Sequence, residues 1–212
     1  MRWDDFLNNY AQLPVIDTNV LLAGVTNPRA LKVQLTRWVK AKKIIQAKRG
    51  VYVLADKYRK VPLYEPYLAF LLKKPSYISL EKALEYYGLI PEAVPVFTSL
   101  TTKRQAKFIS AAGTFVYRHI KKALFWGYNS VTVNGQTGFI ASPEKALLDL
   151  FYINRIKISF AFLKELRLQN IDKLDTKKLL ISAERFKSPG ILKAANTVNK
   201  YISGYKEEEK IL

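Results

Sequence analysis

The chain has 212 residues, a length that suits one large domain or two small ones. Hydrophobic residues make up 49% and charged residues 25%, a balance that indicates a globular protein and excludes disordered and collagen-like chains. The sequence has no cysteine, which excludes disulfides, thiolate zinc sites and a cysteine nucleophile. The single histidine, His119, excludes a multi-histidine metal site.

The net charge is strongly positive. There are 35 lysines and arginines against 17 acidic residues, which gives +18 at pH 7. Such a field attracts polyanions, so nucleic acid is the first candidate partner, an anionic membrane surface is the second, and a basic protein without a polyanionic partner stays open. No apolar run reaches the ~18–20 residues that span a bilayer, and the N-terminus has no apolar signal-peptide core. We therefore expect a cytoplasmic protein that does not contact a membrane.

The positive charge is concentrated near the N-terminus. Residues 26–60 hold 11 basic residues and one acidic residue, Asp56. This density is typical of a surface that contacts phosphates. The basic stretch ends near Val61-Pro62, where a Tyr/Pro-rich segment begins. We expect a DNA-binding domain over residues 1–60 and a second domain over residues 61–212, with a sheet in 61–141 and helices in 142–212.

Three helices are predicted in the first domain. Apolar residues at helical spacing mark the first of these: Trp3, Phe6, Leu7 and Tyr10. Asp17 is placed to cap a second helix that runs to about Leu22 and is closed by Ala23-Gly24. Asn27-Pro28 indicates the start of a third, which runs to about Lys42.

The third helix has two different faces at 100° per residue. We expect one face to be buried through Leu31, Leu35, Trp38 and Val39. The other face supplies the candidate DNA contacts Arg29, Lys32, Val33, Gln34, Thr36, Arg37 and Lys40. Short polar, basic and slightly apolar side chains read base edges and grip the flanking phosphates. A solvated basic face remains the alternative.

Two short strands are predicted next, over residues 44–47 and 51–54, joined by Lys48-Arg49-Gly50. Gly50 permits the positive backbone dihedral of a tight hairpin. Three helices followed by a basic-tipped hairpin is the plan of a winged helix-turn-helix, in which the third helix enters the major groove. Lys48 and Arg49 at the tip would contact the phosphate backbone or the minor groove beside it.

The second domain mixes strands and helices. Strands are predicted over residues 94–99, 107–110, 113–119, 125–128, 131–134 and 137–141. Helices are predicted over residues 66–74, 80–87, 160–169, 175–186 and 189–205, with Ser79 as the cap of the second. Ser142 and Pro143 start another, in which Ala146, Leu147 and Leu150 form the core face and Lys145 is free to meet a partner. The predicted class is therefore α+β, with a winged helix-turn-helix before a mixed α/β domain that ends in helices.

The candidate catalytic groups are sparse. Glu144 and Asp149 do not share a helix face, and Glu81 and Glu85 share one without a nearby companion ligand. His119 lies in a basic run, where a surface histidine is more common than a catalytic base. We expect no metal, no cofactor and no enzymatic activity. Two alternatives stay open: a magnesium-dependent nuclease targeted by a winged helix, and an RNA-binding protein.

Three stretches carry a family resemblance. The first is the N-terminal winged helix. The others are residues 98–104 (TSLTTKR) with 113–120 (GTFVYRHI), and the more specific residues 141–152 (ASPEKALLDLFY). Over about residues 5–165 the chain resembles the AbiEi-type antitoxins. These are transcriptional regulators of type IV toxin–antitoxin systems, whose usual setting is abortive infection by phage.

The resemblance implies a function and partners. Such antitoxins bind inverted repeats in their own promoter and repress the operon, and they counteract a nucleotidyltransferase-type toxin without needing a stable complex with it. The chain is accordingly expected to bind double-stranded DNA, as a monomer or by dimerising on its site. The resemblance assigns no individual residue to toxin neutralisation.

Overall fold

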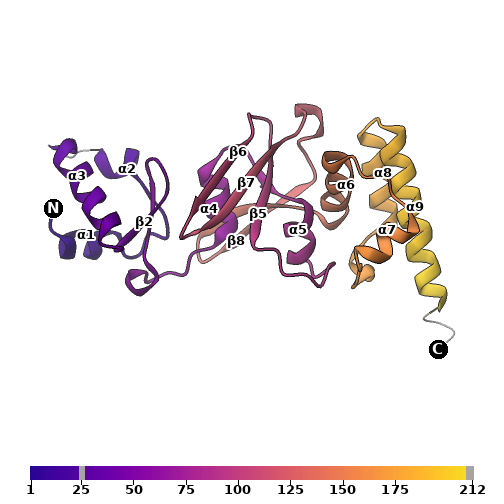
Figure 1. Cartoon of the computed structure of the whole chain (residues 1–212), viewed down its shortest axis with the longest axis horizontal. Helices are drawn as coiled ribbons and strands as arrows, with labels where there is room; N and C mark the ends of the chain where they lie inside the picture. The colour runs from indigo at the N-terminus through magenta and orange to yellow at the C-terminus, as the bar shows by residue number, and fades with distance from the viewer. Residues whose placement is uncertain (24–26, 209–212) are drawn as a thin grey trace.

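The protein is an elongated α+β molecule with three parts along its long axis (Figure 1). The computed structural model describes residues 1–23 and 27–208. Small helices and a short sheet form one end, a mixed sheet lies in the middle, and helices form the C-terminal end. The predicted α+β class with a helical C-terminal end is confirmed. In the described ranges, no helix is both long and apolar enough to cross a bilayer.

The N-terminal unit, residues 1–60, combines helices with an antiparallel sheet of order β1-β3-β2. Its elements are α1 (Trp3–Tyr10), β1 (Ile16–Asp17), α2 (Thr18–Leu22), α3 (Pro28–Lys40), β2 (Ile44–Lys48), β3 (Val51–Leu54) and the 3₁₀ turn η1 (Asp56–Tyr58). Asp17 Oδ1 accepts a hydrogen bond from the Asn19 amide at 2.8 Å, so the predicted cap of α2 is confirmed. Ala23 follows α2 as its C-cap, whereas Gly24 of the predicted stop lies outside the described residues.

The central sheet has the order β6-β7-β5-β4-β9-β8. Its strands are β4 (Tyr77–Ile78), β5 (Val96–Thr101), β6 (Ala106–Ser110), β7 (Gly113–His119), β8 (Tyr128–Val133) and β9 (Gln136–Ala141). The pairs β5–β7 and β4–β9 are parallel, and the other pairs are antiparallel. The strand β4 therefore joins two hairpin-containing halves into one mixed sheet.

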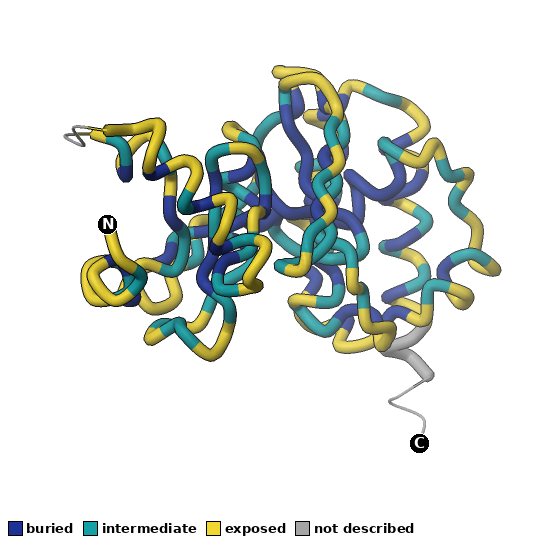
Figure 2. Tube along the Cα trace, turned by 60° about the vertical axis from the view of Figure 1, so that its left-hand side comes forward, coloured by how far each residue is buried: buried dark blue, intermediate teal, exposed yellow. Residues whose placement is uncertain are grey.

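Helices pack on the sheet and extend beyond it toward the C-terminus (Figure 1). They are α4 (Glu65–Leu72), α5 (Leu80–Tyr86), α6 (Pro143–Asn154), α7 (Phe160–Glu165), α8 (Thr176–Arg185) and α9 (Pro189–Glu208), with 3₁₀ turns η2 (Lys122–Leu124) and η3 (Ile171–Lys173). The helix α4 lies against β9, β4 and β5, and α6 lies between α5 and the pair α8–α9. Figure 2 shows buried segments through the sheet and on the inward sides of these helices.

Most predicted elements are observed with shifts at their ends; the helix predicted over 160–169 already ends at Glu165, as α7. Three other elements differ. The strand predicted over 125–128 is absent as such, because η2 precedes it and β8 begins at Tyr128. The strands β1 and β4 were not predicted, since two residues are too short to show a period of two. Ser79 precedes α5 as expected, but its hydroxyl makes no capping bond there.

Two clusters of buried apolar side chains organise the interior. The smaller one lies within the N-terminal unit and includes Phe6, Leu35 and Trp38. The larger one runs from the central sheet through the C-terminal helices. The hairpin β2–β3 contributes to both, because Ile44 and Leu54 belong to the smaller cluster whereas its residues Ala47, Val51 and Val53 belong to the larger. The N-terminal unit is thus packed onto the sheet through this hairpin.

The contact between α4 and β9 depends on Gly138. A Cβ at this position would lie 2.6 Å from Pro66 Cβ and 2.8 Å from the Pro66 carbonyl carbon. Gly138→Ala is therefore expected to lower the free energy of unfolding by about 1–3 kcal/mol, because backbone must shift to admit the methyl group. Urea denaturation measures this effect. Ser130→Ala, at an exposed position on β8, is the control and should change stability by less than ~0.5 kcal/mol; an equal effect at both sites would contradict the close approach.

Candidate nucleic-acid interface

The helix α3 begins where the sequence predicts. Asn27 Oδ1 accepts a hydrogen bond from the Ala30 amide at 3.0 Å, and Pro28 occupies the first helical position. The helix ends at Lys40, two residues before the predicted end. Its bounds and cap place a rigid 13-residue helix at the end of the molecule farthest from α9 (Figure 1).

The inward face of α3 packs on an aromatic cluster. Leu31, Leu35 and Trp38 are buried, as predicted, whereas Val39 is only half-buried. The Trp38 ring lies 4.6 Å from Phe6 and 5.2 Å from Trp3, measured between ring centroids. Aromatic contacts of this kind stabilise a small core beyond the area they bury. They fix the rotation of α3 about its axis and hence which side chains point outward.

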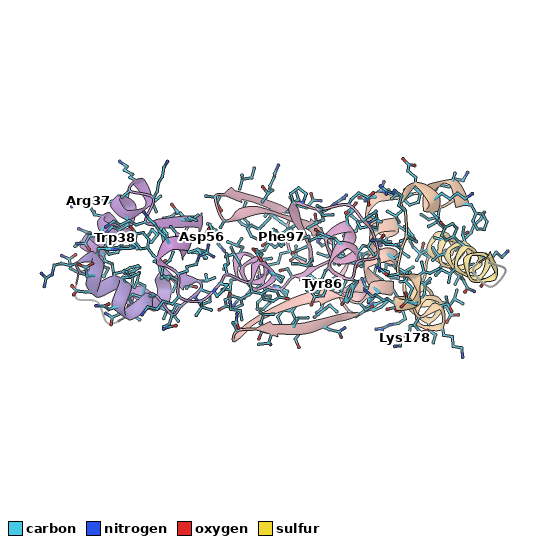
Figure 3. All side chains as sticks on the ribbon, turned by 90° about the horizontal axis from the view of Figure 1, so that it is seen from below. Arg37, Trp38, Asp56, Tyr86, Phe97 and Lys178 are labelled. Carbon is cyan, nitrogen blue, oxygen red and sulfur yellow. The ribbon has the colours of Figure 1, made fainter. Side chains whose placement is uncertain are left out.

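The outward face of α3 is basic and open to solvent. Its exposed residues are Arg29, Lys32, Val33, Thr36, Arg37 and Lys40. Figure 3 shows Arg37 at the outer rim of the N-terminal unit and Trp38 directed into it. None of the ion pairs between described residues involves the four cations of this face. Their charge is therefore available to an anionic partner.

The three uncharged candidate residues of α3 differ in their exposure and hydrogen bonds. Val33 is 52% exposed between the cations. The Thr36 hydroxyl donates to the Lys32 carbonyl at 3.0 Å, which leaves its oxygen free to accept a further hydrogen bond. Gln34 is half-buried, and its Oε1 is buried without a hydrogen-bond partner among the described residues. Val33 and Thr36 therefore share the outward face, whereas Gln34 lies at its edge.

The tip of the β2–β3 hairpin separates the two predicted contacts. Gly50 has φ +84°, as the hairpin requires, and its carbonyl accepts a bond from the Thr18 amide at 2.9 Å. Arg49 is exposed. Lys48 is half-buried: its Nζ donates to the Leu72 carbonyl at 2.7 Å and lies 5.8 Å from the centre of the Phe108 ring. The structure therefore places Arg49 outward and Lys48 against the central sheet.

The segment after the hairpin is also held on the sheet. Gln136, at the start of β9, donates from Nε2 to the Pro62 carbonyl at 2.8 Å. Its Oε1 accepts from the Tyr64 amide at 2.9 Å. Gln136 is buried, so both bonds lie away from water. Together with Lys48 they fix the direction in which α3 faces relative to the rest of the protein.

The prediction that Lys145 is free to meet a partner is wrong. Lys145 and Asp149 of α6 are both 0% exposed and form an ion pair. Lys145 Nζ also donates to the Tyr77 hydroxyl at 2.9 Å, and Asp149 Oδ2 accepts from Ser79 Oγ at 2.8 Å and from Tyr77 at 3.1 Å. We call these four side chains the buried polar cluster. It ties α6 to β4 and to the start of α5, and it explains why Ser79 does not cap that helix.

The buried polar cluster is shielded by aromatic rings. Lys145 Nζ lies 5.0 Å from the centre of the Trp126 ring and 5.1 Å from that of Phe186. Burial lowers the pKa of the Lys145 ammonium and raises the pKa of the Asp149 carboxyl, while the ion pair opposes both shifts. A group sealed in this way holds helices together but cannot reach a substrate from outside.

Two of the remaining candidate carboxylates, Glu85 and Glu144, make internal contacts, and Glu81 is half-buried on α5. Glu85 pairs with Lys82 at 2.6 Å and accepts from the Val94 amide at 3.1 Å. Glu144 is buried and accepts from the Asp175 amide at 3.1 Å. Within the described ranges, no group of three or more His, Asp or Glu side chains is placed to hold a metal ion.

A scan against models of protein families finds no match to this chain, and a search of curated proteins finds none either. The resemblance to AbiEi-type antitoxins therefore stays a prediction. Among the features described, the outward face of α3 is the one whose chemistry points most directly to a partner.

Proposed function

We propose that this protein binds double-stranded DNA through α3 and represses transcription from its own promoter. The observation that carries the proposal is the exposed face of α3, on which four cations without carboxylate partners among the described residues surround Val33 and Thr36. Cations grip phosphates, while arginine, threonine and an apolar side chain discriminate base edges. One surface thus combines the two kinds of contact that sequence-specific binding needs.

The arrangement around α3 supports a winged helix-turn-helix. The order α1-β1-α2-α3-β2-β3, with β3 between β1 and β2, places a two-stranded hairpin directly after the third helix. In this plan the third helix enters the major groove, which is ~12 Å wide and admits one α-helix. The 13 residues of α3 extend over ~20 Å, so a helix of this length lies along several base pairs.

The resemblance extends the proposal to an antitoxin of a type IV toxin–antitoxin system. In this role the chain counteracts a nucleotidyltransferase-type toxin from the same operon, without a stable complex between the two. Each copy presents one α3, so two copies would occupy the two halves of an inverted repeat, about one helical turn or more apart. The central sheet and the C-terminal helices are then the body that carries the antitoxin activity.

The two cations of the hairpin tip should behave differently when replaced. Arg49→Ala should lower the salt dependence of DNA binding by about one phosphate contact, a change of ~0.9 in the slope of log K against log salt. Lys48→Ala should leave that slope unchanged and should instead destabilise the protein by about 1–2 kcal/mol, because the Leu72 carbonyl loses its donor. Titrations at several salt concentrations and urea denaturation measure the two effects. A smaller slope for Lys48→Ala would show that this lysine leaves Leu72 to contact DNA.

The proposed function is tested with the DNA directly upstream of the protein's own reading frame. We expect the purified full chain to bind this DNA at least ~10³-fold more tightly than unrelated duplex of the same length, the lower end of the range for specific binding. Equal affinity for the two would overturn specific repression. Co-expression with the product of the neighbouring reading frame tests the antitoxin part: that product should arrest growth alone and not together with this protein. Growth arrest in both cases would overturn the antitoxin proposal and leave the DNA-binding proposal standing.

A further inference from the structure

A large groove lies far from α3, where the end of β7, the C-terminal part of α6 and the start of α9 meet. It is open to solvent and has a volume of about 1180 Å³. Figure 1 places α6 and α9 in the half of the molecule opposite to α3. The groove is therefore a separate feature from the proposed duplex-binding surface. Its volume exceeds the ~300–1,000 Å³ of a typical small-molecule site.

The lining of the groove is basic. Its charged residues are Arg118, Lys121, Arg155, Lys157 and Lys193, and His119 lies among them. The structure describes every residue of the lining, and none of them is an aspartate or a glutamate. Unbalanced positive charge inside a concave surface focuses the field and attracts anions.

Most of these cations are free to meet a ligand. Lys121, Arg155, Lys157 and Lys193 are exposed, and none makes a hydrogen bond or ion pair through its side chain to another described residue. Arg118 differs, because it donates to the Asn154 side chain and, at 3.4 Å, to the Ile153 carbonyl. Arg118 thus holds the C-terminal end of α6 against β7, while the other cations supply charge.

The groove also has an apolar part. Ile153, Ile156 and Ile158 line it and are half-buried, so part of each side chain remains open to a ligand. Ile191 and Ala194 at the start of α9 also line the groove and are buried. The half-buried Tyr152 also lines the groove. An aromatic ring and apolar surface beside cations suit a ligand with flat bases and charged phosphates, since bases stack on aromatic rings while the phosphates meet the lysines.

We propose that this groove binds a short single-stranded segment of nucleic acid. A duplex presents its phosphates on a rigid convex surface and keeps its bases stacked inside, so it cannot place bases in a concave site. A single strand exposes both its bases and its phosphates, and it is flexible enough to bend into the groove. RNA and single-stranded DNA share these groups, and the experiment below distinguishes the two.

The test uses the purified full chain and fluorescence anisotropy with labelled 12-nucleotide oligo(U) and oligo(dT). A 12-base-pair duplex, ATP and poly-glutamate serve as competitors. We expect both single strands to bind, with oligo(U) tighter if the groove recognises the ribose hydroxyl. Lys157→Ala/Lys193→Ala should weaken binding roughly tenfold and lower the salt slope by about 1.4, which corresponds to two phosphate contacts on a single strand. Lys157→Glu/Lys193→Glu should weaken it further.

Matched controls separate the groove from overall charge and from α3. Lys164→Glu/Lys177→Glu makes the same change of charge at exposed positions outside the lining and should retain most of the affinity. Arg37→Ala should leave single-strand binding unchanged. Equal losses in the groove variant and the charge control would overturn the proposal, as would a duplex, ATP or poly-glutamate that competes as well as the single strand. Loss of single-strand binding in Arg37→Ala would place the single strand on α3 and also overturn it.

Discussion

Replacing Asp149 with alanine is expected to lower the free energy of unfolding by about 3–5 kcal/mol. The change leaves Lys145, which is 0% exposed, without the carboxylate that balances its charge. The Ser79 hydroxyl and the Tyr77 hydroxyl lose an acceptor at the same time. Removing one partner of a buried ion pair costs more than the pair contributes, because the remaining charge stays out of water.

Urea denaturation of three variants tests this expectation. Asp149→Ala should show the large loss, whereas Lys145→Met/Asp149→Leu should lose much less, since well-packed apolar residues avoid the burial of charge. Asp172→Ala, at an exposed position in η3, is the control and should change stability by less than ~0.5 kcal/mol. A loss below ~1 kcal/mol for Asp149→Ala would mean that water enters the buried polar cluster.

The same variant should respond to pH in a defined direction. Burial lowers the pKa of Lys145 in the folded protein, while the unfolded chain keeps the ordinary value of 10.5. Without Asp149, the unfolded state binds more protons than the folded state between those two pKa values. The stability of Asp149→Ala should therefore rise as pH increases through this window and level off above it. Unfolding measured at several pH values shows whether Lys145 is the group responsible.

The buried polar cluster also shows what the sequence could not reveal. Lys145 and Asp149 are four residues apart on α6, a spacing that is usual for an exposed ion pair on a helix. Their burial depends on Tyr77 and Ser79, which are about 70 positions earlier in the chain. Helical periodicity involves only residues of the same helix, so it cannot indicate a partner that is distant in the sequence. The same holds for Lys48, whose acceptor is a backbone carbonyl 24 positions later.

Local features were predictable because they depend on neighbouring residues. The cap at Asn27, the buried face of α3 and the positive φ of Gly50 each follow from short-range rules and are confirmed. The strand order of the central sheet, in contrast, does not depend on neighbouring residues. The strand β4 has two residues and pairs with β5 and β9, which lie on different sides of it in the sheet. Such pairing is set by packing across the whole domain, so element types were accessible from the sequence and the sheet order was not.

Arginine replacements on α3 are expected to have the largest effect on DNA binding. Arg29→Ala and Arg37→Ala should each weaken binding to the upstream DNA by about 1–3 kcal/mol, the range for an arginine that contacts a base edge through two hydrogen bonds. Both side chains are exposed, so neither change should alter the free energy of unfolding by more than ~0.5 kcal/mol. The combined variant should lose nearly the sum of the two effects, because the residues lie eight positions apart.

Unrelated duplex distinguishes base contacts from phosphate contacts. An arginine that reads bases loses more affinity for the upstream DNA than for unrelated DNA, whereas one that contacts phosphate loses the same on both. Lys40→Ala, at the end of α3, should weaken both equally and reduce the salt slope by ~0.9. Lys60→Ala, an exposed lysine of the N-terminal unit outside α3, should affect neither. Equal losses on both DNAs for Arg29→Ala and Arg37→Ala would assign α3 to phosphate binding alone, and specificity would then have to come from another surface.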